Sequence, residues 1–323
     1  MKVLITRRIP EVGIDILSEF AELDIWKEEK AMPREELLRR IEGKDALLCL
    51  LSDRIDAEAM DRGRDLKVIA NYAVGYDNID IDEATKRGIP VLNTPGVLTD
   101  ATADLAFALI LSAARRIPEG DRYIRAGKFR TWGPRLMLGK DLSKMTLGVV
   151  GAGKIGSAVM RRAKGFGMKL IYHNRSRKKE LEEEIGARYM ELDDLIEGAD
   201  IISLHCPLTE ETHHLIGKRE LSIMKEDSIL VNTARGPVVD EKALYDALAN
   251  GTIGSAGLDV FEDEPEVYSP LMELENVTMV PHVGSATVRT RNRMAEMVSM
   301  GIIDVINGNT PNNLVRTMKG KGV

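Results

Sequence analysis

Short apolar runs alternate along the first hundred residues with longer segments whose hydrophobic positions recur at helical spacing. The run at 3–5 precedes a helix-length segment at 13–20, and the run at 46–51 precedes another at 57–63. Alternation of this kind predicts a parallel sheet with helices on both faces. The same pattern predicts further strands at 23–26, 68–70 and 91–92, and further helices at 34–41 and 82–87.

A glycine motif follows the apolar run 147–150. Gly151, Gly153 and Gly156 lead into a helix-compatible segment and then into a second apolar run at 168–172. In such a unit one glycine forms the tight turn, one lets the backbone approach a pyrophosphate, and one allows close helix packing. The free N–H groups of the helix N-terminus favour an anion. GxGxxG also occurs in turns that bind nothing, but strands on both sides predict a dinucleotide site here.

The end of the second strand of this unit bears on the choice of cofactor. An acidic residue about 20 positions beyond the glycines would bind the ribose 2′-hydroxyl of NAD. This chain instead has Asn174, Arg175, Ser176 and Arg177. Because no carboxylate repels a phosphate and two guanidinium groups could hold one, we expect NADP(H) to be preferred and NAD(H) to remain possible. The alternative is a solvated basic helix start.

The segment that joins the two halves of the pattern is unusually apolar. Residues 102–116 predict a helix that is apolar on nearly every face, buried between domains or between subunits, and Pro118 is expected to end it. We expect the polar stretch 119–144 to form an irregular arm. Its Trp132 favours local packing or a dimer contact over substrate contact.

A second parallel sheet is predicted from apolar runs at 200–205, 228–232, 253–259 and 277–280. A final helix at 288–306 is expected to cross back and cover the first domain, which would then be discontinuous. The predicted fold class is α/β, with a Rossmann cofactor domain inserted into a flavodoxin-like substrate domain. The domain boundaries are 1–98 for the first part of the substrate domain, 99–283 for the dinucleotide-binding domain, and 284–323 for the returning segment.

Charge and cysteine usage narrow the class of protein. A net charge of −6 over 323 residues argues against a general nucleic-acid binder, which needs a basic face. Cys49 and Cys206 lie in apolar runs and are expected to be buried thiols in a reducing compartment. No apolar run is long enough to span a membrane, and Met1 runs directly into a predicted strand, so we expect a cytoplasmic protein without a signal peptide. No histidine pair has metal-ligand spacing, and no metal is predicted.

Three polar residues stand at strand ends of the second predicted sheet, where open α/β sheets bind their ligands. They are Arg235, Glu264 and His282. Each alone would be weak evidence, since a loop arginine is usually solvated and a lone histidine is more often structural. Together they supply a cation for a carboxylate, a general acid/base, and a carboxylate to orient that base.

Longer motifs connect the chain to a known family. LLSDRID at 50–56, NYAVGYDNID at 71–80 and HVGSATVRTRNRM at 282–294 resemble the D-isomer-specific 2-hydroxyacid dehydrogenase family over essentially the whole chain. Within it the glyoxylate and hydroxypyruvate reductases are most similar. The resemblance implies NAD(P)H-dependent reduction of a small 2-oxo acid, glyoxylate to glycolate or hydroxypyruvate to D-glycerate, by a homodimer.

The resemblance also implies roles for individual residues. Arg235 would bind the carboxylate and carbonyl of the substrate, His282 would give a proton to the carbonyl oxygen, and Glu264 would hold and polarise His282. Asn71 belongs to a loop whose Val74 and Gly75 N–H groups would bind the substrate carboxylate. The cofactor would contact Thr102, Gly151, Gly153, Lys154, Ile155, Gly156, Asn174, Arg175, Ser176, Cys206, Pro207, Thr212, Thr233, Ala234, Asp259, His282 and Gly284.

Two other functions stay open at this point. D-3-phosphoglycerate dehydrogenases share the pattern, although many carry a regulatory extension beyond the position where this sequence stops. A dinucleotide-sensing binding protein of the corepressor type resembles the enzymes even at Arg235, Glu264 and His282, and it would bind the cofactor but turn over poorly. Formate dehydrogenases are less similar because they have Gln where this chain has Glu264.

Overall fold

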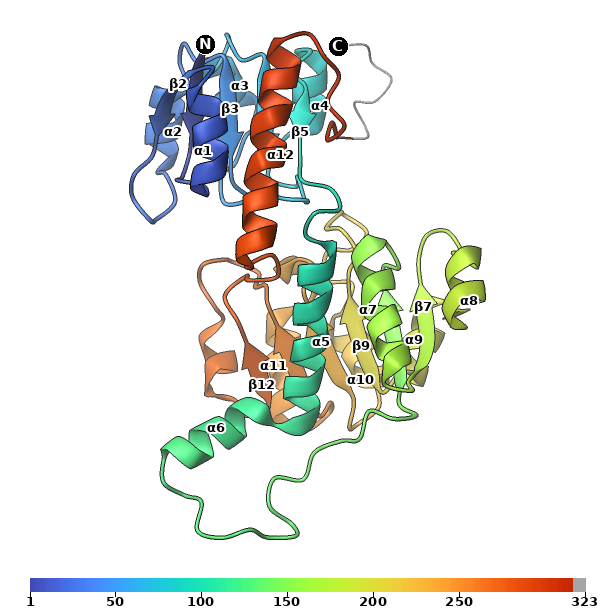
Figure 1. The fold of residues 1–323 in the computed structure, drawn as a ribbon. Helices are drawn as coiled ribbons and strands as arrows, with labels where there is room; N and C mark the ends of the chain where they lie inside the picture. Colours follow the sequence, from blue (N-terminus) through green and yellow to red (C-terminus); the bar gives the residue numbers. More distant parts are fainter. Residues whose placement is uncertain (316–323) are drawn as a thin grey trace. The chain divides into compact units, whose positions relative to one another are not determined.

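The computed structural model describes residues 1–315, which fall into two compact units (Figure 1). The first unit comprises Met1–Leu98 and the chain from Ser285 on, and the second comprises Thr99–Gly284. The first unit is therefore made from both ends of the chain. The last part of the predicted returning segment, 316–323, lies outside the described residues.

The first unit contains a five-stranded parallel sheet in the order β2-β1-β3-β4-β5. Its strands are short, and the inner strands β3 and β4 are buried along their whole length, as a sheet covered by helices on both faces requires. The order is that of flavodoxin-like sheets. The strands are β1 (Lys2–Ile5), β2 (Glu22–Ile25), β3 (Ala46–Cys49), β4 (Val68–Asn71) and β5 (Val91–Leu92), and the helices are α1 (Glu11–Ser18), α2 (Arg34–Arg40), α3 (Ala57–Arg62), α4 (Ile81–Lys86) and α12 (Val288–Ile306).

Helix α12 returns to the first unit and packs against α1. The two helices approach closely at Gly13, where an added Cβ would lie 2.8 Å from the Cβ of Ala295. Ser299 Oγ donates to the Gly13 carbonyl at 2.9 Å, and the Tyr72 hydroxyl donates to the Arg291 carbonyl at 2.6 Å. These contacts join residues more than two hundred positions apart, so the end of the chain completes the layer that covers the first sheet.

The second unit contains a seven-stranded parallel sheet in the order β12-β11-β10-β9-β6-β7-β8. The prediction of two parallel-sheet α/β domains is confirmed, and the order of this sheet is the doubly wound one, extended by an edge strand. The strands are β6 (Thr146–Val150), β7 (Lys169–His173), β8 (Arg188–Tyr189), β9 (Ile201–Leu204), β10 (Ile229–Asn232), β11 (Ser255–Leu258) and β12 (Val277–Met279), and the helices are α5 (Thr99–Arg115), α6 (Ile117–Arg125), α7 (Lys154–Gly165), α8 (Lys179–Ile185), α9 (Leu192–Gly198), α10 (Lys218–Ile223) and α11 (Glu241–Ala249).

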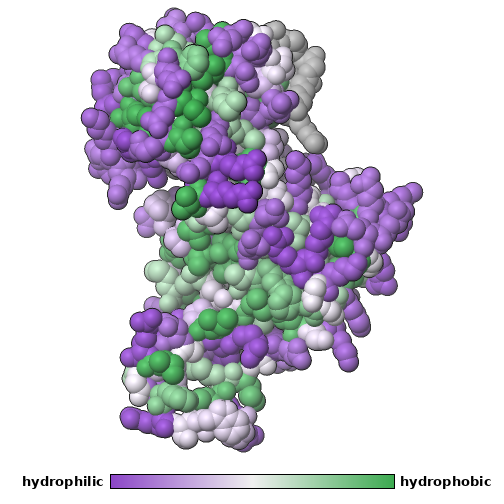
Figure 2. Space-filling view, in the orientation of Figure 1, coloured by the Kyte–Doolittle hydropathy of each residue, from purple (hydrophilic) through white to green (hydrophobic). Residues whose placement is uncertain are grey.

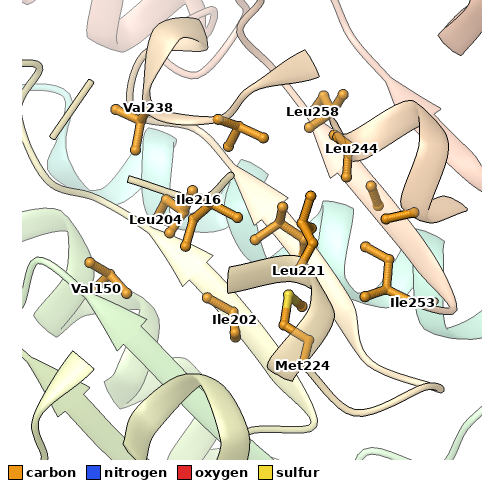
Figure 3. Packing of buried hydrophobic residues seen from close by; sticks show 14 of the residues in the cluster. Val150, Ile202, Leu204, Ile216, Leu221, Met224, Val238, Leu244, Ile253 and Leu258 are labelled. Carbon is orange, nitrogen blue, oxygen red and sulfur yellow. The ribbon is translucent and has the colours of Figure 1, made fainter. Parts of the chain in front are cut away.

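Two hydrophobic cores cover the two faces of this sheet. Along β10, Leu230 faces one core, while Ile229 and Val231 face the other, as the two-residue period of a strand requires. Figure 3 shows the first core, in which Leu221 and Leu244 from α10 and α11 pack near strand residues. Helices α5 and α7 cover the opposite face. Burial on both faces leaves only the strand ends open for ligands.

Helix α5 is buried for a different reason from the one expected. The sequence suggested burial between domains or subunits, but its buried residues pack on the second sheet itself. Gly257 in β11 allows this, because a Cβ there would lie 3.0 Å from the Cβ of Leu109. The helix is apolar over a wide arc since it faces both the sheet and α7.

The arm after α5 is not fully irregular, and that part of the prediction was wrong. Arg116 has a left-handed backbone (φ 54°) that ends α5, and α6 begins at the next residue. Pro118 lies in the first turn of α6, where a missing N–H costs nothing. The proline therefore starts a second helix in addition to following the first.

Candidate active site

The glycine turn lies at the carboxyl end of β6, and its three glycines meet different constraints. Gly151 has φ +94°, and a Cβ there would lie 2.6 Å from the Cys206 nitrogen. A Cβ on Gly156 would lie 2.3 Å from the Gly151 carbonyl oxygen, so the helix could not approach the turn with any side chain there. No atom lies within 4 Å of the corresponding Gly153 position. The turn thus leaves its middle glycine open for the close approach of a ligand.

Helix α7 begins directly after this turn, with Lys154 and Ile155 as its first residues, and no side chain caps its N-terminus. The helix is long enough to carry a dipole, and the first-turn N–H groups of a helix have no partners within the helix. An uncapped N-terminus beside an unobstructed glycine fits the pyrophosphate of a dinucleotide. The residues present therefore fit the cofactor that the sequence predicts.

The next strand end, after β7, carries the basic segment. Arg175 and Ser176 are exposed, and Asn174 donates to the Ser176 carbonyl at 2.8 Å. Arg177 forms a two-bond pair with Glu182, with Nε–Oε1 2.8 Å and Nη2–Oε2 2.9 Å. Of the two guanidinium groups considered for a 2′-phosphate, only Arg175 is outside this pair.

At the end of β9, His205 and Cys206 lie against the glycine turn. Burial lowers the pKa of His205 to about 4, so its ring is neutral near pH 7, and its Nε2 lies 2.8 Å from Ser203 Oγ. Burial raises the pKa of the Cys206 thiol to about 11. Thr212 Oγ1 closes the following loop by donating to the Pro207 carbonyl at 2.7 Å. Neither His205 nor Cys206 is therefore suited to acid–base or nucleophilic chemistry.

Asp259, after β11, organises the turn that follows β12. It is 1% exposed, and its two oxygens accept from the N–H groups of Val283 (2.6 Å) and Gly284 (2.8 Å). Burial raises the pKa of Asp259, and these two N–H groups counteract the shift. The predicted residues Thr102, Asp259 and Gly284 meet here, since a Cβ on Gly284 would lie 3.0 Å from Asp259 Oδ2 and 3.3 Å from Thr102 Cγ2.

His282 and Glu264 form the predicted pair. His282 Nδ1 lies 2.7 Å from Glu264 Oε2, and each side chain is 27% exposed. The other carboxylate oxygen, Oε1, accepts from the Phe261 N–H at 3.0 Å, which fixes the turn that carries Glu264. Because an ionised carboxylate only accepts, this geometry assigns a proton to Nδ1 and leaves Nε2 for another partner.

Arg235 follows β10 in a turn whose backbone is held by the buried side chain of Asn232. Asn232, 1% exposed, accepts from the Ala234 N–H at 3.0 Å and donates to the Arg235 carbonyl at 2.8 Å. Thr233 Oγ1 lies 3.4 Å from His205 Nδ1. Sequence reasoning missed Asn232, although a polar residue that ends a wholly apolar strand was a signal for it.

The predicted residues of the second unit follow the order of its sheet. Parallel strands end at one edge, so the order β12-β11-β10-β9-β6-β7 lines up their C-terminal residues. From one end of this edge to the other, the strands are followed by His282, Asp259, Arg235, Cys206, Gly151 and Asn174.

Among the described residues, no group of histidines, cysteines and carboxylates could hold a metal ion, and no helix is long and apolar enough to cross a membrane.

The loop predicted to bind a substrate carboxylate lies in the first unit, after β4. Asn71 is fully buried, and its amide donates to the Gly75 carbonyl (2.8 Å) and to Asn78 Oδ1 (3.0 Å). Asn93 donates to the Val74 carbonyl at 2.7 Å. Asn71 therefore faces the loop's own backbone, so its direct effect is on the shape of the loop. Asn78 and Asn93 were not predicted.

Comparison with known proteins identifies the family of the chain. Residues 107–284 match the family described as D-isomer specific 2-hydroxyacid dehydrogenase, NAD binding domain. A glyoxylate reductase from Thermococcus litoralis is 54% identical over 318 residues, which are 97% of this chain and 96% of that protein. The match therefore extends over nearly the full length of both proteins.

Solved structures agree with the sequence matches. The TT0316 protein from Thermus thermophilus superposes with a TM-score of 0.92 at 47% identity, covering 98% of this chain and 100% of that chain. An NADPH-dependent glyoxylate/hydroxypyruvate reductase from Sinorhizobium meliloti, in complex with NADP and malonate, has a TM-score of 0.85 at 32% identity, covering 98% and 96%. The protein therefore belongs to the D-isomer specific 2-hydroxyacid dehydrogenase family and is an oxidoreductase that uses a nicotinamide dinucleotide.

Proposed function

We propose that the protein reduces glyoxylate to glycolate and hydroxypyruvate to D-glycerate. The observation that carries the proposal is the edge of the second sheet, where a glycine turn, a guanidinium and a histidine–carboxylate pair follow one another in strand order. The relatives named glyoxylate reductase support the substrate class. The Sinorhizobium enzyme, solved with malonate, is a relative in complex with a small carboxylate.

The chain's own groups divide the work between them. When bound, the nicotinamide dinucleotide supplies a hydride to the carbonyl carbon. The Arg235 guanidinium holds the substrate carboxylate and polarises the carbonyl. His282 donates its Nε2 proton to the developing alkoxide, and Glu264 keeps the ring oriented through Nδ1. In the oxidation direction the same Nε2 accepts the proton, so one ring serves both directions.

The first unit contributes a loop that recognises an anion by its backbone. We assign the N–H groups of Val74 and Gly75 to the substrate carboxylate. The support is that Asn71 and Asn93 bind the carbonyl oxygens of this loop at 2.8 and 2.7 Å, which fixes the carbonyls and leaves the N–H groups as the available donors. Preorganised N–H donors favour an anion without the cost of burying a second charge.

NADPH is the proposed cofactor. Arg175 is exposed, and Ser176 offers a hydroxyl beside it. Arg177 is held by Glu182, so Arg175 is the guanidinium assigned to the 2′-phosphate. The Sinorhizobium relative, whose solved complex contains NADP, supports NADPH as the cofactor.

A homodimer is the proposed assembly, and the support comes from the arm. Residues of α6 and the segment after it expose large apolar side chains, and Trp132 is 77% exposed. Figure 2 shows hydrophobic residues at the surface of this part of the molecule. Several exposed large apolar side chains on one segment favour a protein contact. The exposed apolar residues of the arm are Ile117, Ile124, Phe129, Trp132, Leu136 and Leu138.

The cytoplasm is the proposed location, supported by two free, buried thiols.

Steady-state kinetics with a panel of 2-oxo acids tests the function. The panel contains glyoxylate, hydroxypyruvate, pyruvate and 3-phosphohydroxypyruvate, each with NADPH and with NADH. We expect the highest kcat/KM for glyoxylate or hydroxypyruvate with NADPH. A clear preference for 3-phosphohydroxypyruvate would identify a phosphoglycerate dehydrogenase instead, and cofactor binding without turnover would identify a sensor.

A further inference from the structure

Glu241 has a buried carboxylate that has no part in the proposed chemistry and contacts the turn that carries Glu264. Glu241 is the first residue of α11 and is only 5% exposed. A carboxylate in the first turn of a helix usually remains in water, where it interacts with the dipole at little cost. Burial of a charged group is costly unless specific donors satisfy it. The position of Glu241 therefore calls for a structural explanation.

The donors belong to the segment that holds Glu264. Glu241 Oε1 accepts from the Glu262 N–H at 2.8 Å, and the Tyr268 N–H also donates to this carboxylate. In return, Glu262 Oε2 lies 3.4 Å from the Glu241 N–H. Burial raises the pKa of Glu241, and the nearby carboxylate of Glu262 adds to the shift. The two glutamates thus clasp the start of α11 to the turn at residues 261–264.

Each side of this clasp leads to a candidate catalytic group. On one side, the Phe261 N–H donates to Glu264 Oε1 at 3.0 Å. The next N–H along the chain, that of Glu262, is the one that Glu241 binds. On the other, Gly236 directly follows Arg235 and packs on the same peptide, because a Cβ there would lie 1.8 Å from the Phe261 oxygen. The Phe261–Glu262 peptide is therefore in contact with both loops.

His214 braces the clasp from outside. Its Nε2 pairs with Glu262 Oε1, and its backbone N–H donates to the Pro237 carbonyl at 2.7 Å. The Ile216 N–H donates to the Val238 carbonyl at 3.1 Å, which extends the contact along the segment after Arg235. Three separate stretches of chain therefore converge on Glu262, and Glu241 is the most deeply buried of the charged groups there.

We propose that Glu241 is a positioning residue for the reaction: through the Glu262 N–H it fixes the turn that aims Glu264 at His282 relative to the loop that carries Arg235. The inference rests on the proposed function, because it concerns the same histidine–carboxylate pair. Glu241 touches neither substrate nor cofactor in this scheme. Its effect is on the placement of Glu264, which orients His282, and of Arg235.

The test compares Glu241→Ala with Glu241→Gln, because glutamine keeps an oxygen that accepts from the Glu262 N–H. We expect Glu241→Ala to lower kcat for glyoxylate reduction about tenfold, which corresponds to the loss of one satisfied buried donor. The Kd for NADPH should change by less than twofold. Glu241→Gln should restore most of the lost kcat. Glu241→Asp, whose carboxylate is one methylene shorter, should give an intermediate value and replaces the alanine variant if that protein does not fold.

Glu220→Ala is the matched control. Glu220 also accepts from a backbone N–H at a helix start of the second unit, that of Gly217 at 3.1 Å, and its ion pair is with Arg219, so its bonds do not involve the residues 261–264 that Glu241 holds. We expect it to lose stability without losing kcat. A Glu241→Ala or Glu241→Asp enzyme with wild-type kcat, or a Glu220→Ala enzyme with the same loss of kcat, would overturn the proposal.

A double-mutant cycle with Glu264→Gln separates this inference from the proposed function. If Glu241 acts through Glu264, the double variant Glu241→Ala/Glu264→Gln should be hardly slower than Glu264→Gln alone. Full additivity would overturn the positioning role. If Glu264→Gln itself had wild-type activity, the histidine–carboxylate pair of the proposed function would fail instead, whatever the result for Glu241.

Discussion

The C-terminal edges of the two sheets show what the same architecture can be used for. Both units are parallel sheets covered by helices, yet the edge of the second carries a glycine turn, a guanidinium and a histidine–carboxylate pair, while the edge of the first carries a loop tied down by amides. Asn71, Asn78 and Asn93 are neutral groups that bind one another or the loop backbone. Charge and proton transfer are thus assigned to one edge and neutral backbone recognition to the other.

The two edges differ because the glycine turn after β6 and the loop after β4 offer different groups to a ligand. In the second unit, Gly151 at φ +94° and the unobstructed Gly153 bring a helix N-terminus to a ligand. In the first unit Asn71 and Asn93 hold the Gly75 and Val74 carbonyls of the loop after β4, and the N–H groups of this loop are the donors assigned to a ligand. Substitutions at the second edge should therefore alter kcat or cofactor affinity, and substitutions at the first should alter mainly KM for the 2-oxo acid.

The largest expected effect is that of His282→Ala. Loss of the proton donor should lower kcat for glyoxylate reduction by about 10²–10⁴-fold. NADPH affinity, measured by fluorescence titration, should be retained because the glycine turn is untouched. The contrasting variant at the first edge is Asn71→Ala, which should raise KM for glyoxylate more than it lowers kcat. If Asn71→Ala reduced kcat as strongly as His282→Ala, the division between the two edges would be wrong.

Next in size is Arg235→Lys. A guanidinium can bind a carboxylate through two parallel bonds and an ammonium cannot, so kcat/KM for glyoxylate should fall by about 10- to 100-fold with a higher KM and a lower kcat. NADPH binding should remain near the wild-type value. Collapse of cofactor binding with intact KM for glyoxylate would reassign Arg235 to the cofactor.

Arg175→Ala tests the cofactor end of the same edge. Removing the charge-assisted contact to a 2′-phosphate should weaken NADPH by about 1.5–3 kcal/mol, which is one to two decades in affinity. NADH lacks the phosphate and should be affected little. Arg177→Ala is the comparison variant, and its effect should be smaller because Glu182 already holds that side chain. A wild-type preference for NADH would contradict the assignment outright.

The last expected effect is on stability in acid, where the contributions of His205 and Asp53 should have opposite signs. Burial lowers the pKa of His205 to about 4, so the unfolded chain takes up this proton more readily than the folded one as pH falls below 6.5. By pH 5 this costs the second unit about 2 kcal/mol. In the first unit burial raises the pKa of Asp53, so the folded state holds that proton more readily and acid favours folding.

Hydrogen exchange read by mass spectrometry can follow the two units separately at pH 7 and pH 5. His205→Gln should remove the acid-sensitive part from the second unit, and Asp53→Asn should leave that part unchanged. Equal acid sensitivity of the second unit in the wild type and in His205→Gln would show that His205 is not the group responsible.

The sequence predicted those features of the fold that depend on residues close together in the chain. Strand runs and the spacing of Gly151, Gly153 and Gly156 each follow from the backbone within a few residues, so the parallel sheets could be predicted. The pairing of His282 with Glu264, which the structure shows, was implied by a motif match instead. Nothing local in the sequence brings these two side chains together.

What sequence reasoning missed depends on burial. Glu241 looks like an ordinary first-turn glutamate, and only the fold shows that Glu262 covers it. The pairing of Arg177 with Glu182 could have been suspected from charge alone, but its geometry needs the turn after β7. Helix α6 was missed because it has no buried residues and its sequence, IPEGDRYIR, is mostly polar, as in a loop. Its Pro118 was interpreted only as the end of the preceding helix.

The short turn that Asp259 holds also bears on how such an enzyme can diversify. Asp259 binds the N–H groups of Val283 and Gly284, just before the chain leaves the second unit. His282 is therefore anchored by the sheet that bears the glycine turn, the guanidinium and Glu264. Everything assigned to hydride and proton transfer is encoded in one uninterrupted stretch, 99–284. Exchange of the flanking sequence would therefore change the loop assigned to the substrate carboxylate and leave that stretch intact.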